Sequence, residues 1–282
     1  MTIREVYRVI REASEKNTDE HEATAIARVV MESVMSMQPA DLMIRGCEEI
    51  PPSKLLKLSE IATRLREGEP VQYILGEAWF HGLKLHVAPG VLIPRPETSQ
   101  LVDLLTDMVG ERTDLRIIDL GTGSGAIAIS LARALRFPQI TAVDISAQAV
   151  EIARNNAVNL SVDIDFIEGD MLKAETLPEG SWDIVVSNPP YIEPAEMSAM
   201  EKRVLDYEPH IALFTPKDDP LCFYRAVAGY AFSTLRQGGI LAFEINPDYA
   251  DELEMMLRKT GFSDVHTLRD FCGRLRFSIS RL

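Results

Sequence analysis

The chain has 282 residues, of which 46% are hydrophobic and 26% are charged, a length that suits one full α/β domain plus a small accessory domain. No run approaches the roughly 18 consecutive apolar residues that a membrane span needs. The first residues already include Arg4 and Glu5 and lack the apolar core of a signal peptide. We therefore expect a cytoplasmic protein without membrane segments.

The net charge of −14 argues against direct binding of long nucleic acid, because phosphate contacts need clustered Lys and Arg. It is compatible with a basic protein partner, since complementary fields speed encounter. Cys47, Cys222 and Cys272 form no Cys-x-x-Cys pair, and the five histidines show no metal-ligand spacing. We expect no metal site and no disulfides, and we interpret the cysteines as buried free thiols.

The first 72 residues predict a small helical-bundle domain. Apolar residues within 3–10 fall at i, i+3, i+4 and i+7, the spacing of one helical face. The same spacing recurs within 23–30, after a helix-start signal at 17–20, and again within 58–65.

Residues 73–95 alternate apolar and polar positions between glycines and prolines, which predicts a β-hairpin linker. From residue 96 to residue 282, extended and helical patterns alternate. This alternation predicts a mostly parallel, Rossmann-like α/β sheet with helices on both faces. The seven candidate strands span 116–120, 140–143, 164–167, 184–187, 240–244, 265–268 and 275–279, and the short link between the last two predicts an antiparallel edge hairpin.

Three glycines follow the first strand, in Gly121-Thr122-Gly123-Ser124-Gly125. Glycine lets the chain turn sharply and bring backbone N–H groups close to a ligand, and a helix beginning near Ser124 adds its positive end. This run alone is equally compatible with a tight structural turn. It departs from the Gly-x-Gly-x-x-Gly pattern of dehydrogenases, so it favours S-adenosylmethionine over NAD.

Acidic residues end the next two strands. Asp144 lies 19 residues past Gly125, where two carboxylate oxygens can accept the vicinal hydroxyls of a ribose. Asp170 can accept an adenine amino group while Met171 packs on the base. Either aspartate alone is also typical of a helix cap or turn. Together with the glycines they mark the ligand-binding edge of an open α/β sheet.

The fourth strand ends in Asn188-Pro189-Pro190-Tyr191. An amide nitrogen or aromatic amine is a poor nucleophile because its lone pair is delocalised. Asn188 can accept one N–H on its side-chain oxygen, Pro189 can accept the other on a carbonyl whose direction the prolines fix, and Tyr191 offers a flat apolar face. The motif therefore predicts methylation of a planar nitrogen, although Asn-Pro-Pro can also be a simple rigid turn. His210 is interpreted as a structural histidine rather than a base.

The motifs together closely resemble the release-factor glutamine N5-methyltransferase family, known as PrmC or HemK. The resemblance covers nearly the whole chain and is most specific where Pro-Arg-Pro-Glu-Thr at 94–98 and Asn-Pro-Pro-Tyr occur together. The matching segments are 70–76, 92–98, 119–125, Asp144, 188–191, 207–210 and 223–225.

The resemblance implies a class I methyltransferase fold and, as substrate, the glutamine of the Gly-Gly-Gln loop of class 1 peptide chain release factors. It implies that residues 121–125, Asp144, Met171 and Asn188 bind the cofactor and that residues 188–191 hold the glutamine amide. The domain of residues 1–72 would help to grip the release factor.

Arg95 and Glu97 would lie near the methionine end of the cofactor or at the substrate opening. They could instead form an ion pair at a helix start, where Pro96 suits the first turn and Glu97 suits the helix dipole.

Several positions depart from the family pattern, and we expect these changes to affect peripheral packing and substrate affinity rather than chemistry. The departures are Ser99 for the usual Glu, Pro220 for Gly, Asn246 for Gly and Tyr249 for Gln.

Two other acceptors stay open on the sequence alone. Adenine-N6 and guanine-N2 methyltransferases use similar Asn-Pro-Pro loops, but they need a basic recognition region that this acidic chain lacks. Methylation of a ribosomal-protein glutamine is a nearer alternative. A binding protein that has lost activity is disfavoured, because the cofactor and acceptor motifs are complete.

Overall fold

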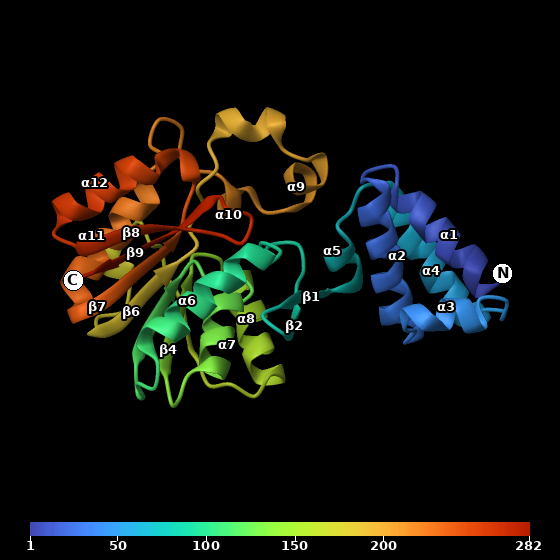
Figure 1. The fold of residues 1–282 in the computed structure, drawn as a ribbon, viewed down its shortest axis with the longest axis horizontal. Helices are drawn as coiled ribbons and strands as arrows, with labels where there is room; N and C mark the ends of the chain where they lie inside the picture. The colour runs from blue at the N-terminus through green and yellow to red at the C-terminus, as the bar shows by residue number, and fades with distance from the viewer. The chain divides into compact units, whose positions relative to one another are not determined.

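The computed structural model describes residues 1–282, which form two compact units. One unit comprises Met1–Glu77 and Met200–Tyr207, and the other comprises Ala78–Ala199 and Glu208–Leu282. The sequence patterns predict residues 200–207 as part of the domain of 96–282. By their contacts they belong to the helical unit instead; Figure 1 labels the helix of this segment α9.

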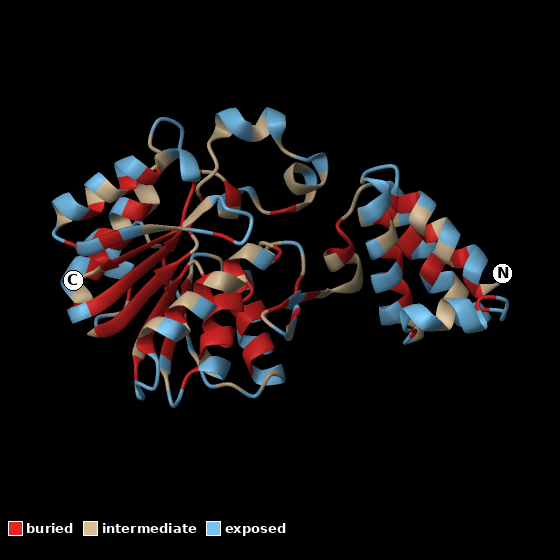
Figure 2. Ribbon diagram, viewed as in Figure 1, coloured by how far each residue is buried: buried red, intermediate tan, exposed pale blue.

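Side-chain hydrogen bonds cap the N-terminal ends of the first two helices of the helical unit. Thr2 and Glu5 form a capping box, and the Asp19 carboxylate accepts from the Glu22 N–H at 2.8 Å, so that orphan donors are satisfied. The apolar stripes of α1, α2 and α4 face one shared core (Figure 2). The helices are α1 (Ile3–Ser14), α2 (Glu20–Met35), α3 (Pro39–Arg45), α4 (Pro52–Arg66), α5 (Val71–Leu75) and α9 (Lys202–Tyr207).

Polar contacts attach α9 to the rest of the helical unit. The Arg203 guanidinium donates to both carboxylate oxygens of Glu22 at 2.5 and 3.1 Å, a bidentate geometry that is stronger than a single contact. The Tyr207 hydroxyl donates to the Glu67 carbonyl at 3.2 Å. A segment far along the chain thus completes this unit.

The second unit opens with a two-stranded sheet, β1 (Glu77–Phe80) and β2 (Leu83–His86). Only His81 and Gly82 connect the strands, and both have positive φ angles, 48° and 73°. Two such residues make the type I′ turn that matches the twist of a hairpin.

A seven-stranded sheet forms the centre of the second unit, in the order β5-β4-β3-β6-β7-β9-β8. Strands β3 to β7 pair in parallel, whereas β9 pairs antiparallel with both β7 and β8. All seven predicted strands and the edge hairpin are confirmed. Their bounds are β3 (Arg116–Leu120), β4 (Gln139–Asp144), β5 (Asp165–Glu168), β6 (Trp182–Ser187), β7 (Leu235–Glu244), β8 (Ser263–Arg269) and β9 (Leu275–Arg281).

Helices cover both faces of this sheet, because alternate strand residues point to opposite sides. Ile117 belongs to a core shared with α6, α7 and α8, whereas Ile118 belongs to a core shared with α11 and α12. The central strands β3, β4, β6 and β7 are accordingly buried along most of their length (Figure 2), whereas the edge strands β5 and β8 have one buried residue each. The covering helices are α6 (Ser99–Val109), α7 (Ala126–Ala134), α8 (Ala147–Asn159), α11 (Cys222–Thr234) and α12 (Ala250–Thr260); α10 (His210–Leu213) and the 3-10 turns η1 (Pro96–Thr98), η2 (Ala174–Thr176), η3 (Pro194–Ala199) and η4 (Pro247–Tyr249) lie in connections.

The prediction that the cysteines are buried is wrong. Cys47 and Cys272 are exposed and Cys222 is only partly buried, because these residues lie in a turn, at a hairpin tip and at a helix start rather than on apolar faces. No helix has both the length and the apolar composition needed to cross a membrane.

Asn156 on α8 links the hairpin to the loop after β3. Its Oδ1 accepts from the His86 N–H at 2.7 Å, and its Nδ2 donates to the carbonyls of His86 and Ser124, each at 2.9 Å.

We expect Asn156→Leu to lower the free energy of unfolding by about 2–3 kcal/mol, because these groups lose their partner. Urea denaturation measures this, with Asn155→Leu at an exposed position of the same helix as the control. Equal losses in the two variants would contradict it.

Candidate active site

A pocket of about 210 Å³ lies at the carboxyl ends of the parallel strands. Strand β3 pairs with β4 on one side and β6 on the other, so the strand order reverses here, where open α/β sheets bind ligands. The pocket collects lining residues from the loops after β3, β4, β5 and β6. The predicted site residues that line it are Gly121, Gly123, Asp144, Asp170, Met171, Asn188 and Pro190.

The three glycines of the loop after β3 have positive φ angles but different surroundings. A Cβ on Gly121 would lie 2.8 Å from the Met171 methyl, and a Cβ on Gly125 would lie 2.9 Å from Ile129 Cδ1. A Cβ on Gly123 would meet nothing within 4 Å. Gly123 thus borders open space in the pocket, whereas Gly125 serves the packing of α7.

Thr122, Ser124 and Gly125, which were predicted to bind the cofactor, do not line the pocket. The buried Thr122 hydroxyl donates to Asp119 Oδ2 at 2.7 Å, and the Ser124 carbonyl accepts from Asn156. Alternate residues of the loop therefore face the protein interior. Helix α7 begins at Ala126, near Ser124 as predicted.

Asp144 and Asp170 are both held by backbone donors. The Asp144 carboxylate accepts from the N–H of Gly123 at 2.8 Å and of Ser146 at 2.9 Å. Burial raises the pKa of Asp144, and these donors act in the opposite direction. The Asp170 carboxylate accepts from the Leu172 N–H at 2.9 Å.

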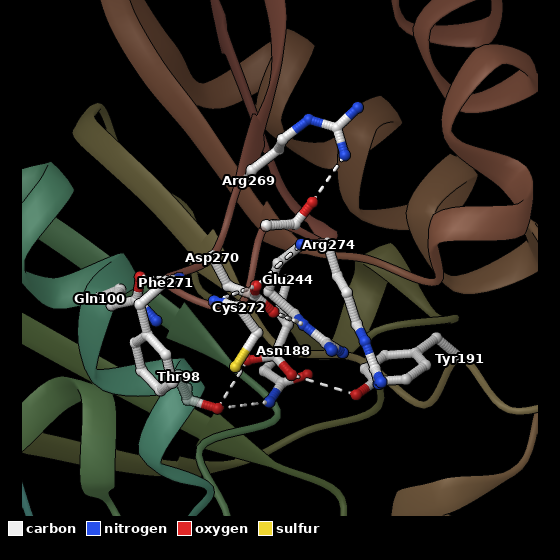
Figure 3. Close-up of polar contacts among 12 residues, drawn as sticks. Thr98, Gln100, Asn188, Tyr191, Glu244, Arg269, Asp270, Phe271, Cys272 and Arg274 are labelled. Atoms are coloured by element: carbon white, nitrogen blue, oxygen red, sulfur yellow. Dashed lines mark hydrogen bonds and ion pairs between the residues drawn. The ribbon is translucent and has the colours of Figure 1, made fainter.

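A chain of hydrogen bonds links the Asn-Pro-Pro-Tyr turn to two other segments (Figure 3). Asn188 Nδ2 donates to the Thr98 hydroxyl at 3.4 Å, and that hydroxyl donates to Glu244 Oε2 at 2.6 Å. The Tyr191 hydroxyl donates to Glu244 Oε1 at 3.1 Å. Burial and the nearby Glu244 charge raise the pKa of Tyr191, so its phenol stays protonated and acts as a donor.

Arg95 does not pair with Glu97. It donates to Glu208 Oε1 at 2.6 Å, and the Ile93 N–H donates to Glu208 Oε2 at 3.1 Å. The Glu208 side chain is 2% exposed. This contact joins two segments that each contribute pocket residues, Leu92 on one and Ile211 on the other. Arg95 and Glu97 themselves do not line the pocket.

His210 and Asn246 have structural contacts. The His210 ring packs edge-on against Phe214, with centroids 5.2 Å apart. Asn246 Nδ2 donates to the Tyr191 carbonyl at 3.0 Å, and Asn246 Oδ1 accepts from the Asp248 N–H. Position 246 was expected to affect peripheral packing and substrate affinity; its side chain contacts the Asn-Pro-Pro-Tyr turn directly.

Sequence reasoning missed several residues of the site. Thr98 belongs to the Pro-Arg-Pro-Glu-Thr segment at 94–98. Glu244 is an acidic residue at the carboxyl end of the strand beside β6, and this position could have indicated a site residue. The apolar part of the pocket wall gave no signal of its own. The additional lining residues are Gly90, Val91, Leu92, Ile145, Ser146, Ala149, Gly169, Leu172, Ile211, Ala212 and Phe223.

The sheet order and the pocket at its switch point define a Rossmann-like methyltransferase of class I. The profile of the Methyltransferase small domain matches residues 96–206. A solved methyltransferase from Pyrococcus furiosus superposes with a TM-score of 0.51 at 20% identity, over 71% of this chain and 89% of its own, which supports the fold.

The profile of the PrmC N-terminal domain matches residues 8–76. The chain is 40% identical to the release factor glutamine methyltransferase of Bacteroides thetaiotaomicron, over 95% of both sequences. It is 39% identical to the same enzyme of Flavobacterium psychrophilum, over 92% of this chain and 91% of that one. The chain belongs to the release factor glutamine methyltransferase family.

The buried Asp119 gives a pH-dependent stability. Burial raises its pKa from 3.8 to about 7, so the folded state binds a proton more readily than the unfolded state between these values. The contribution of Asp119 to the free energy of unfolding then falls as pH rises from about 4 to 7, by at most about 1.4 kcal/mol per pH unit. We expect Asp119→Asn to remove this slope.

Urea denaturation of the ligand-free protein from pH 4 to pH 8 measures the effect. The stability of Asp119→Asn relative to the unsubstituted protein should increase with pH and level off above 7. A constant difference between the two proteins across this range would rule out the shift.

Proposed function

We propose that this protein transfers a methyl group from S-adenosylmethionine to the side-chain amide nitrogen (N5) of the glutamine in the Gly-Gly-Gln motif of class 1 peptide chain release factors, in the cytoplasm. The observation that carries the proposal is the position of Asn188 and Pro190 on the wall of the same pocket as the glycine loop and Asp144. A methyl donor and a planar acceptor can meet at such a place.

The pocket residues fit the parts of S-adenosylmethionine. Gly123 leaves open space beside the loop, and the Asp144 carboxylate lies on the wall where a ribose would need an acceptor. Asp170 would accept from the adenine amino group beside Met171, with Phe223 adding apolar surface. When bound, the cofactor supplies an electrophilic methyl group on a sulfonium.

The turn after β6 would orient the glutamine amide. Asn188 Oδ1 would accept one N–H and the Pro189 carbonyl the other, while the Tyr191 ring supports the flat amide. Holding both N–H groups turns the nitrogen lone pair toward the methyl group, and orientation of this kind contributes about 7–11 kcal/mol to lowering a barrier. The methylated nitrogen is cationic and releases its proton readily, so no strong base is needed.

The helical unit would hold the body of the release factor. Its match to a separate N-terminal domain profile supports a role distinct from chemistry, and the overall charge of −14 favours a basic partner surface. Arg95 would stabilise the wall next to the substrate opening through Glu208, and Glu97 would lie close to Glu244.

The test incubates the purified protein with labelled S-adenosylmethionine and unmodified release factor, either native or with its loop glutamine replaced by alanine. Label is expected only on the native factor. Purified ribosomal proteins form a parallel arm, and label appearing there, or on the altered factor, would overturn the substrate assignment.

Asn188→Ala should lower kcat by about a hundredfold or more, because one of the two N–H acceptors is lost and the amide is misaligned. Cofactor affinity should change little, since the glycine loop and Asp144 are intact. Single-turnover kinetics and calorimetric titration separate the two effects. A variant with a near-normal rate would contradict the orientation mechanism.

Gly123→Ala and Gly125→Ala should fail in different ways. Both glycines have positive φ angles, which cost an alanine about 1–2 kcal/mol at either position. At Gly123 the new methyl group also enters the pocket, so affinity for S-adenosylmethionine should fall. At Gly125 it also meets Ile129 and Ala153, so the free energy of unfolding should fall by about 1–3 kcal/mol more than in the Gly123 variant. Titration and thermal unfolding of both variants decide this, and identical behaviour would refute the assignment.

A further inference from the structure

We propose that Glu244 and Thr98 are positioning residues that fix the direction of the Asn188 amide, and that they thereby make the site select an uncharged amide over a carboxylate. This inference rests on the proposed function. Neither residue was singled out by the sequence patterns as part of the acceptor site, and neither lines the pocket. They would act through Asn188.

The geometry places a buried carboxylate beside the acceptor turn. Ser187 on β6 pairs with Phe243 on β7, so Asn188 and Glu244 follow at neighbouring strand ends. Glu244 is 1% exposed and Thr98 is 4% exposed. Figure 3 shows the Thr98 hydroxyl between the Glu244 carboxylate and the Asn188 amide.

Each hydrogen bond in this chain determines the direction of the next. An ionised carboxylate only accepts, and a threonine hydroxyl has a single hydrogen to donate. Glu244 Oε2 takes that hydrogen at 2.6 Å. The Thr98 oxygen can then only accept toward Asn188, so Asn188 must present its NH2 group to Thr98. Its Oδ1 is left as the acceptor for the substrate.

Glu244 accepts a hydrogen bond on each of its two oxygens, from the Thr98 hydroxyl at 2.6 Å and from the Tyr191 hydroxyl at 3.1 Å. Burial raises the pKa of Glu244, and Glu97 acts in the same direction, whereas these two hydrogen bonds and the Arg276 charge favour the carboxylate form. The Tyr191 hydroxyl also uses its hydrogen on Glu244, so one carboxylate orients both polar side chains of the acceptor turn.

The consequence is selectivity for the substrate side chain. A glutamine amide offers two N–H groups to Asn188 Oδ1 and the Pro189 carbonyl. A glutamate carboxylate in the same place offers none and would face two acceptors, which is an unfavourable pairing. If the Asn188 amide could turn over, its NH2 group would instead donate to the carboxylate.

The experiment compares Glu244→Gln, Thr98→Val and Thr98→Ser. In Glu244→Gln the glutamine can donate to Thr98, which frees the threonine hydrogen and lets the Asn188 amide turn over. Thr98→Val removes the link, whereas Thr98→Ser keeps it. Thr106→Val is the matched control, because the Thr106 hydroxyl bonds only to the Val102 carbonyl within α6.

Two quantities are measured for each protein: kcat and KM with native release factor, and the inhibition constant of a factor whose loop glutamine is replaced by glutamate. We expect Glu244→Gln and Thr98→Val to lower kcat by about tenfold or more. We also expect the preference for glutamine over glutamate, measured as the inhibition constant of the glutamate factor divided by the KM of the native factor, to fall by about tenfold in these two variants. In Thr98→Ser and Thr106→Val, kcat and this preference should stay close to the values of the unsubstituted protein.

Two results overturn the inference: a preference for glutamine over glutamate that is unchanged in Thr98→Val, or one that is lost equally in Thr98→Ser. In the second case the loss would come from a general loosening of the site, because the serine variant keeps the hydroxyl. If Glu244→Gln does not fold, the serine and valine variants at position 98 decide alone. Failure of the unsubstituted protein to methylate release factor is a separate result, and it refutes the proposed function instead.

Discussion

The parallel pairing of β3 with β4 and β6 is the constraint on which the site depends. Because these strands run in the same direction, their carboxyl ends lie on one edge of the sheet, and the loops at 121–125, 144–146 and 188–191 leave that edge together. Backbone hydrogen bonds maintain the arrangement: the N–H groups of Gly121 and Thr122 donate to the Val143 carbonyl at 2.8 and 3.0 Å. The pocket is a direct result of sheet topology.

Side-chain contacts across long sequence separations complete what the sheet begins. Thr98 meets Glu244 across 146 residues, and Arg95 meets Glu208 across 113. Each contact joins a residue of the Pro-Arg-Pro-Glu-Thr segment to a buried carboxylate elsewhere. This gives a physical reason for that segment to occur with the Asn-Pro-Pro-Tyr motif, since its residues support the acceptor turn and the pocket wall.

The sequence predicted the features that are local in origin. All seven strands follow from apolar runs with helical segments between them, and the glycines and Asp144 follow from strand ends. What it missed depends on tertiary contacts. The partners of Arg95 and Thr98 are decided by segments far away in the chain. No periodicity in the sequence records those contacts.

The helical unit has a consequence for any attempt to isolate or exchange it. Its final helix, α9, is synthesised more than a hundred residues after the others, so residues 1–77 leave the ribosome before the guanidinium that pairs with Glu22. A recombinant fragment ending at Glu77 would leave this carboxylate without its arginine partner. A chimera between relatives must therefore carry two separate stretches of sequence from the same parent, and a single crossover point cannot transplant this unit intact.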